Sequence, residues 1–165
     1  MPLYFAYGSC MNELDLSRTV QAKTVGIARL NNYKLVFSRY SHTRKGGVAD
    51  IVKVNGEYLE GVLFEVPNFI KLDAREGHPT FYKRKRVKVL IIETGDYVWA
   101  YTYEIVRKEI EEVKPSREYC LLIWEGARVL SIDYRRKLKE SLLKKRKRYS
   151  LLAPSNERLF NKIGD

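Results

Sequence analysis

The first twenty residues show an apolar run that stops abruptly at a small polar turn. Leu3–Tyr7 is apolar and aromatic and is followed by Gly8 and Ser9, which predicts a buried strand that enters a turn. A short helix is expected from about Met11 to Arg18, with Ser9 or Cys10 near its N-cap. The chain is therefore expected to open as strand, turn and helix.

The middle of the chain is dominated by strand-like patterns. Residues 23–39 are rich in β-branched and aromatic residues and are interrupted by Asn31-Asn32, which predicts a hairpin or a bent pair of strands. A polar loop is expected at residues 41–47. Both residues of Asn55-Gly56 tolerate a positive φ, so this dipeptide predicts a tight hairpin turn between two strands. Further strands are expected at residues 48–54, 58–66, 82–92 and 97–106.

Helical patterns lie between these strands and at the end of the chain. A helix is expected from Pro67 to Glu76, with Gly77 as its C-cap. Two more begin at Pro115 and near Ser131, each with an apolar face at helical spacing, and residues 149–165 are expected to form an arm or short helix. The pattern predicts one α+β domain of residues 1–165, a curved mixed sheet or barrel with a basic C-terminal helix and arm at about 131–165.

Charge is concentrated in two segments. Residues 135–148 carry +8 and residues 83–86 carry +4 of the net charge of +11, so the rest of the chain carries −1. A solvated basic face is the simplest interpretation of such runs. Weak contact of residues 135–148 with nucleic acid or another polyanion is the alternative, because phosphate attraction needs no base-reading motif. No zinc-finger spacing, RNP motif or heptad after a basic region is present.

Three features of the sequence predict a cytoplasmic location. No apolar run approaches the roughly 20 residues that a membrane helix needs. Met1–Phe5 lacks the basic region that precedes the apolar part of a signal peptide. Cys10 and Cys120 match no disulfide or metal framework, and free thiols in a reducing compartment are the simplest account of them.

Three positions carry polar groups that packing does not require. The turn at residues 7–12 presents backbone N–H groups, which suit a carboxylate or phosphate. Glu76 stands in the last turn of its helix, where the dipole disfavours a carboxylate, and partial burial there would raise its pKa toward that of a general base. Tyr119 lies one turn into a helix, and its hydroxyl needs a partner if buried. An ordinary connection, an exposed Glu and a core Tyr are the alternative interpretations.

Cysteine and histidine chemistry is a minority interpretation. Cys10 could be a nucleophile at a helix N-terminus, where a thiolate is stabilised. The two histidines, His42 and His78, stand in no recognisable partnering or metal-binding motif. A surface loop and a structural turn explain them.

Taken in order, six segments resemble the γ-glutamylcyclotransferase-like (AIG2-like) family. They span most of the chain, and the ordered set is more specific than any member. The segments are YGSCMN at 7–12, GGVADIV at 46–52, GVLFEV at 61–66, LDAREG at 72–77 with the following Pro79 and Tyr82, PSREY at 115–119, and EGAR at 125–128.

The resemblance implies a fold and a reaction. The fold is a compact mixed β-barrel flanked by helices. The turn of Tyr7, Gly8, Ser9 and Cys10 would hold the glutamyl group through backbone amides. Glu76 would act as acid and base while the substrate cyclises to 5-oxoproline and releases an amine or amino acid. Tyr82 and Tyr119 would line the pocket, and the resemblance implies no metal or cofactor.

Two features depart from the family pattern. Cys10 stands where the family has Asn. The basic segment at 135–148 has no place in the family chemistry. The alternative hypothesis is therefore a non-catalytic module that keeps the γ-glutamyl pocket and binds nucleic acid or another polyanion through its basic helix.

Overall fold

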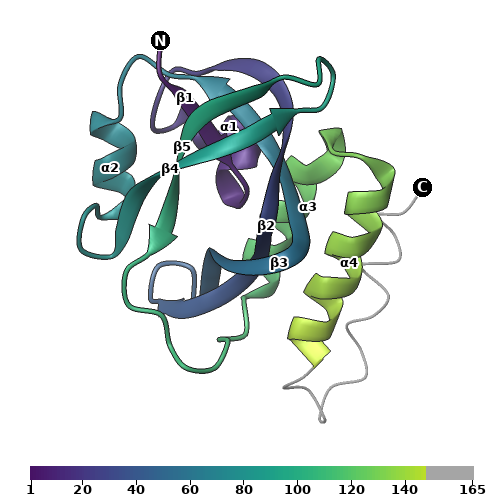
Figure 1. Ribbon diagram of the computed structural model, residues 1–165. Coiled ribbons are helices and arrows are strands. Elements are labelled where there is room, and N and C mark those ends of the chain that lie inside the picture. The colour runs from purple at the N-terminus through teal and green to yellow at the C-terminus, as the bar shows by residue number, and fades with distance from the viewer. Residues whose placement is uncertain (148–165) are drawn as a thin grey trace.

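A computed structural model describes residues 1–147 and shows a closed five-stranded barrel (Figure 1). The strand order around the barrel is β1-β3-β2-β4-β5. Neighbouring strands are antiparallel except at the closure, where β1 runs parallel to β5 and Tyr4 lies opposite Tyr101. The expected mixed barrel is confirmed. The strands are β1 (Leu3–Ala6), β2 (Lys23–Ser41), β3 (Gly46–Glu65), β4 (Tyr82–Ile91) and β5 (Tyr97–Ile105).

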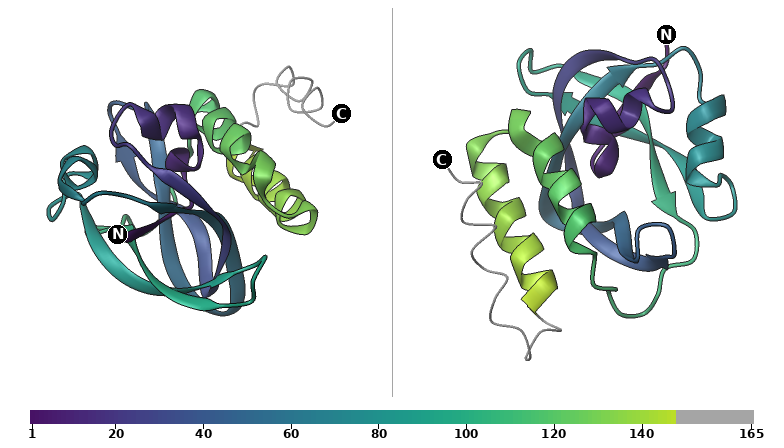
Figure 2. Two further views of the ribbon diagram at one scale, coloured as in Figure 1. Left: turned by 90° about the horizontal axis from the view of Figure 1, so that it is seen from above. Right: turned by 180° about the vertical axis from the view of Figure 1, so that it is seen from behind.

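Helices flank the outside of the barrel. Figures 1 and 2 show α1 and α3 behind it, α4 beside α3, and α2 at the opposite side. The two C-terminal helices are present as expected, whereas the expected arm at 149–165 lies outside the described residues. No helix within residues 1–147 is long and apolar enough to cross a membrane. The helices are α1 (Glu13–Ser17), α2 (Ile70–Glu76), α3 (Arg117–Gly126) and α4 (Ile132–Lys147), with 3-10 turns η1 (Ser9–Met11) and η2 (Ala127–Val129).

The hairpin expected at Asn55-Gly56 is wrong, because both residues lie inside the single long strand β3. Residues 23–39 likewise form part of one strand, β2, which is bent rather than folded back. The two strands bend together where Asn32 (φ 62°) and Gly56 (φ 83°) meet, and the Gly56 N–H donates to Asn32 Oδ1 at 3.1 Å. Asn and Gly at positive φ serve a bulge as well as a turn, so the local pattern could not distinguish them.

Two helix starts differ from the expectation. Asn12, rather than Ser9 or Cys10, caps α1, and its Oδ1 accepts the Asp15 N–H at 3.1 Å. Ser9 and Cys10 belong to the preceding 3-10 turn. Helix α2 begins three residues after Pro67, because the Asn68 side chain accepts the Ile70 N–H and forms a turn there.

Helices α3 and α4 begin close to the starts expected at Pro115 and near Ser131, and a serine caps each of them. Ser116 Oγ accepts the Tyr119 N–H, and Ser131 Oγ accepts the Tyr134 N–H, each at 3.2 Å. The amide and hydroxyl of Ser131 also donate to the buried carboxylate of Glu60 on β3. The cap of α4 thus ties this helix to the barrel wall.

Helix α3 presses directly on the turn that follows β1. A Cβ atom on Gly126 would lie 2.7 Å from the Asn12 nitrogen and 2.9 Å from the Met11 Cβ, so only glycine allows this approach. Apolar side chains from several elements fill the space between barrel and helices, and the fully buried ones include Phe5, Phe37, Phe64, Leu72, Ile123 and Leu142. This packing holds residues 8–12 against the end of the barrel.

Candidate active site

A small cavity of about 40 Å³ lies at this end of the barrel and gathers residues from distant parts of the chain. All seven site residues that the sequence predicts line it, and their roles stay predictions. Three further residues lie there that the sequence did not single out. The predicted seven are Tyr7, Gly8, Ser9, Cys10, Glu76, Tyr82 and Tyr119, and the additional three are Tyr4, Ala49 and Tyr103.

Glu76 is the last residue of α2, and Gly77 in the left-handed conformation (φ 67°) ends the helix there. Only 17% of the Glu76 side chain is exposed. Burial raises the pKa of this carboxyl to about 7, against the opposing effect of the Arg75 and Arg44 cations. The carboxyl can therefore both accept and return a proton near neutral pH.

Arg75 precedes Glu76, but its guanidinium binds mainly to Asp15 and Thr19. Its guanidinium forms an ion pair with Asp15 on α1 and donates to the Asp15 carbonyl at 3.1 Å and to Thr19 Oγ1 at 2.9 Å. Its Nε lies 4.0 Å from Glu76 Oε1. Arg44 also reaches Asp15, at 3.6 Å. Asp15 thus engages both cations, which leaves burial as the dominant influence on the pKa of Glu76.

Cys10 contacts the same carboxyl, with its Sγ 4.0 Å from Glu76 Oε1. Burial and then the Glu76 charge raise the pKa of the Cys10 thiol to about 11. The thiol is protonated at neutral pH and acts as a weak donor to the carboxylate. This argues against the nucleophile interpretation, which needs a thiolate.

Backbone groups hold the tyrosine side chains of the cavity wall. The Tyr82 hydroxyl donates to the Ala49 carbonyl at 2.6 Å, and the Tyr7 hydroxyl donates to the Tyr103 carbonyl at 2.6 Å. Tyr119 differs, because its hydroxyl accepts the Ala49 N–H at 3.0 Å. A hydroxyl that accepts one bond can still donate its own proton, so Tyr119 is the tyrosine best placed to reach a bound molecule.

Gly8 lies where the chain passes close to two other parts of the wall. A Cβ atom there would lie 3.1 Å from the Ala49 Cβ and 3.7 Å from the Tyr119 hydroxyl. Hydrogen bonds from Met11 N–H to the Gly8 carbonyl and from Asn12 N–H to the Ser9 carbonyl, both 3.1 Å, close the 3-10 turn. The N–H groups of Ser9 and Cys10, earlier in this turn, have no acceptor among residues 1–147.

Tyr103 and its partner Asp73 are the cavity support that the pattern missed. The Tyr103 hydroxyl donates to Asp73 Oδ1 at 2.7 Å, and Arg84 Nη1 donates to Asp73 Oδ2 at 2.6 Å. Asp73 therefore fastens α2 to β4 and β5. Its place in the LDAREG segment was the available signal, whereas nothing local distinguishes Tyr4 or Tyr103 from core aromatic residues of a strand.

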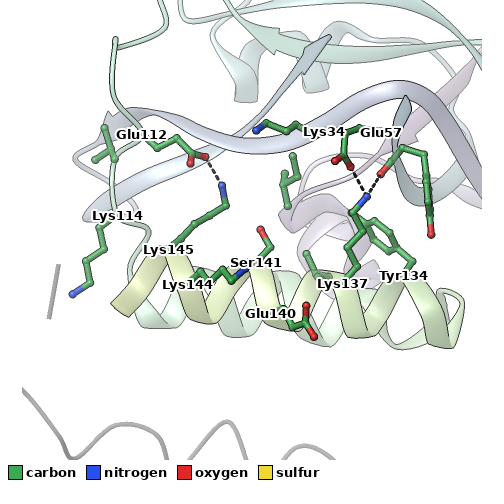
Figure 3. A pocket seen from close by; sticks show the side chains of 14 residues that line it. Lys34, Glu57, Glu112, Lys114, Tyr134, Lys137, Glu140, Ser141, Lys144 and Lys145 are labelled. Carbon is green, nitrogen blue, oxygen red and sulfur yellow. Dashed lines mark hydrogen bonds and ion pairs between the residues drawn. The ribbon is translucent and has the colours of Figure 1, made fainter. Parts of the chain in front are cut away.

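A much larger cavity of about 820 Å³ lies between α4, the bent part of β2 and β3, and residues 112–114 (Figure 3). Two of its carboxylates, Glu57 and Glu112, pair with lysines. Lys137 contacts Glu57 at 2.5 Å and lowers the pKa of that carboxyl, and Lys145 forms an ion pair with Glu112. The lowered pKa makes Glu57 a poor proton acceptor near neutral pH, whereas the raised pKa of Glu76 suits proton transfer, so the small cavity is the candidate active site. Within residues 1–147 no cluster of His, Cys, Asp or Glu could hold a metal ion.

Comparison with known proteins shows the family of the chain. The model of the family described as gamma-glutamyl cyclotransferase, AIG2-like matches residues 4–121. A solved structure titled gamma-glutamyl cyclotransferase is 31% identical with a TM-score of 0.78, and the match covers 84% of this chain and 86% of that chain. No curated protein matches the chain at a significant level.

Two other solved structures are comparably similar. An uncharacterized protein from Homo sapiens is 32% identical with a TM-score of 0.77, over 83% of this chain and 85% of that chain. YkqA from Bacillus subtilis is 30% identical with a TM-score of 0.73, over 86% of this chain and 54% of that chain. The match of residues 4–121 covers more than half of the sequence, and the chain therefore belongs to the gamma-glutamyl cyclotransferase, AIG2-like family.

Proposed function

We propose that the protein is a γ-glutamylcyclotransferase that converts a small-molecule γ-glutamyl compound into 5-oxoproline and a free amine or amino acid. The observation that carries the proposal is the Glu76 carboxyl, whose pKa of about 7 and position beside the 8–10 turn suit it to move one proton. Membership of the family supports the same reaction.

The 8–10 turn binds the α-carboxylate of the substrate in this proposal. The N–H groups of Ser9 and Cys10 have no acceptor among residues 1–147, so these backbone donors are free to bind the carboxylate. Use of backbone donors also explains why Cys can stand where the family has Asn. The Tyr119 hydroxyl contributes a further donor at the same wall.

The reaction then needs one base and no redox step. Glu76 accepts a proton from the α-ammonium group, and the freed nitrogen attacks the γ-carbonyl carbon to form the ring C–N bond. The original amide C–N bond breaks as Glu76 returns the proton to the departing nitrogen. The ring nitrogen keeps one hydrogen in 5-oxoproline and gives up its second proton to the released amine, which leaves as an ammonium group. Because attack is intramolecular, the enzyme chiefly holds the folded rotamer of the substrate and excludes unproductive ones.

The decisive experiment measures 5-oxoproline formed from γ-glutamyl amino acids, γ-glutamyl amines and glutathione. We expect turnover of at least one class, and Glu76→Gln should abolish it with an unchanged circular dichroism spectrum. Glu57→Gln is the matched control, because it neutralises a carboxylate in the larger cavity. Folded protein that is inactive on every compound, or an active Glu76→Gln variant, would contradict the proposal.

The alternative, a non-catalytic module that binds a polyanion through residues 135–148, stays a prediction. Several cations of this segment hold α4 on the barrel. Lys137 pairs with Glu57, Lys145 pairs with Glu112, and Arg146 Nη1 donates to the Pro115 carbonyl at 3.0 Å. These internal contacts account for part of the charge and favour the enzyme as the primary function.

A further inference from the structure

The outer face of the β4–β5 hairpin carries a row of exposed aromatic side chains. Tyr97, Trp99 and Tyr101 alternate along β5, and 56%, 53% and 36% of them are exposed. The residues that alternate with them lie on the core side of the strand: Val98 is partly buried, and Ala100 and Thr102 are buried. We call the outer side chains of Tyr97, Trp99, Arg86 and Lys88 the aromatic face.

Neither the core nor the candidate active site accounts for this face. None of its residues lines either cavity. Helices α1, α3 and α4 lie along other sides of the barrel, as the views from above and behind show (Figure 2). Contiguous large apolar groups on a surface are typical of a binding site, because exposure to water is unfavourable for them.

Cations from the neighbouring strand are interleaved with the rings. Lys88 lies opposite Trp99 in the strand pairing, and Arg86 lies opposite Tyr101. The Arg86 guanidinium is 4.3 Å from the centre of the Trp99 ring, and Lys88 Nζ is 5.6 Å from the Tyr97 ring. Neither cation forms an ion pair within the described part of the chain, so both remain available to an anion.

This combination specifies the chemistry of the partner. Exposed rings beside unpaired cations suit a molecule that alternates flat bases with phosphates. Rings two residues apart on a strand are separated by roughly 6.6 Å, about twice the 3.4 Å per nucleotide of a stacked strand, so successive rings can hold bases of an extended strand. Tyr, Trp and Arg are enriched at protein interfaces but Lys is depleted there, so Lys88 is the residue of this face that favours a polyanion. The charge of +4 on residues 83–86, which include Arg86, favours the same partner.

We propose that the aromatic face binds single-stranded nucleic acid, with bases stacked on Trp99 and Tyr97 and phosphates held by Arg86 and Lys88. Binding of this kind is tolerant of sequence, because every base offers a flat face. It is independent of the cyclotransferase reaction, since the face lies outside the small cavity.

The two tryptophans provide a direct readout. Trp99 is half exposed, whereas only 5% of Trp124 is exposed. A Trp124→Phe variant therefore reports from Trp99 alone. Titration with oligothymidylate or oligouridylate should quench its fluorescence, and the affinity should fall as salt rises. Polyphosphate of similar length supplies charge without bases and should leave the fluorescence nearly unchanged. Comparison of the affinities for the two oligonucleotides shows whether the face prefers DNA or RNA.

Variants distinguish stacking from general charge. Trp99→Ala in the otherwise natural chain should weaken binding of a fluorescein-labelled oligonucleotide by about fivefold to a hundredfold. Arg86→Gln with Lys88→Gln should reduce the salt slope by about 1.4. Arg136→Gln with Lys144→Gln is the matched control, because it removes two exposed charges from α4 and should leave Trp99 quenching intact.

Several results would overturn the proposal. One is undetectable binding of either oligonucleotide. Another is polyphosphate binding as tight as oligonucleotide binding, with no effect of Trp99→Ala. Self-association that Trp99→Ala abolishes, without oligonucleotide binding, would assign the face to contact between copies. Cyclotransferase activity should be unchanged in Trp99→Ala, so failure of this proposal and failure of the proposed enzyme function are separate results.

Discussion

The raised pKa of Glu76 makes a quantitative prediction about stability. A carboxyl with a folded-state pKa of about 7 and a reference pKa of 4.5 binds its proton more tightly in the folded protein. The folded state therefore holds more protons than the unfolded state between these pH values, and this group lowers stability as pH rises from 4.5 to 7. The cost of keeping it ionised above pH 7 is about 3 kcal/mol, at 1.36 kcal/mol for each pKa unit.

Glu76→Gln removes this cost because the amide does not ionise. The quantity to compare is the free energy of unfolding of the variant minus that of the natural protein. We expect this difference to be roughly 3 kcal/mol larger at pH 8 than at pH 4. Urea denaturation of both proteins at several pH values measures the difference, in which the other titrating groups cancel. Glu57→Gln is again the control, and its smaller effect has the opposite sign, because Lys137 lowers the pKa of Glu57.

A difference between Glu76→Gln and the natural protein that does not change with pH would refute the reasoning. It would mean that Glu76 ionises as easily in the folded chain as in the unfolded chain. The proton transfer proposed for catalysis would then lack a carboxyl with a pKa near 7. If Glu76→Gln is both inactive and more stable than the natural protein at pH 8, then Glu76 serves catalysis and lowers the stability of the fold.

Three further predictions concern the surroundings of Glu76. The kcat/KM should fall as pH drops below about 7, and Arg44→Gln should move this acid limb upward, because the Arg44 cation favours the ionised carboxylate. The Cys10 thiol should resist iodoacetamide at pH 7.5 in the folded protein and react after unfolding, as mass spectrometry can measure. Gly126→Ala should destabilise the fold by about 1–3 kcal/mol in urea and reduce turnover, because the new methyl group would press on Asn12.

Features set by neighbouring residues could be predicted from the sequence. The starts of α3 and α4 near Pro115 and Ser131 and the C-cap at Gly77 depend on a few adjacent positions, and the structure has all three. The ordered family segments allowed the barrel as a whole to be predicted as well. The dipeptide Asn55-Gly56 marks the limit, since its positive φ is compatible with a bulge as well as a hairpin.

Contacts between distant residues could not be predicted from local pattern. The Tyr7 hydroxyl bonds the carbonyl of Tyr103, which is 96 positions later, and Tyr119 accepts the N–H of Ala49, 70 positions earlier. Barrel closure and the packing of α3 create these pairs. The composition of the cavity wall is therefore a property of the fold, whereas the position of Glu76 at a helix end was visible in the sequence.

The LDAREG segment shows how one short helix separates support from chemistry. Asp73 binds Tyr103 and Arg84 on the barrel, and Arg75 binds Asp15 on α1. Helix α2 is thereby anchored to the barrel and to α1 by charged contacts that do not involve Glu76. If Arg75 were free to pair closely with Glu76, the cation would lower the pKa of that carboxyl and remove its ability to return a proton near neutral pH. Asp15 prevents this by engaging the guanidinium, and so the residue that tunes the proposed base lies on a different helix from the base itself.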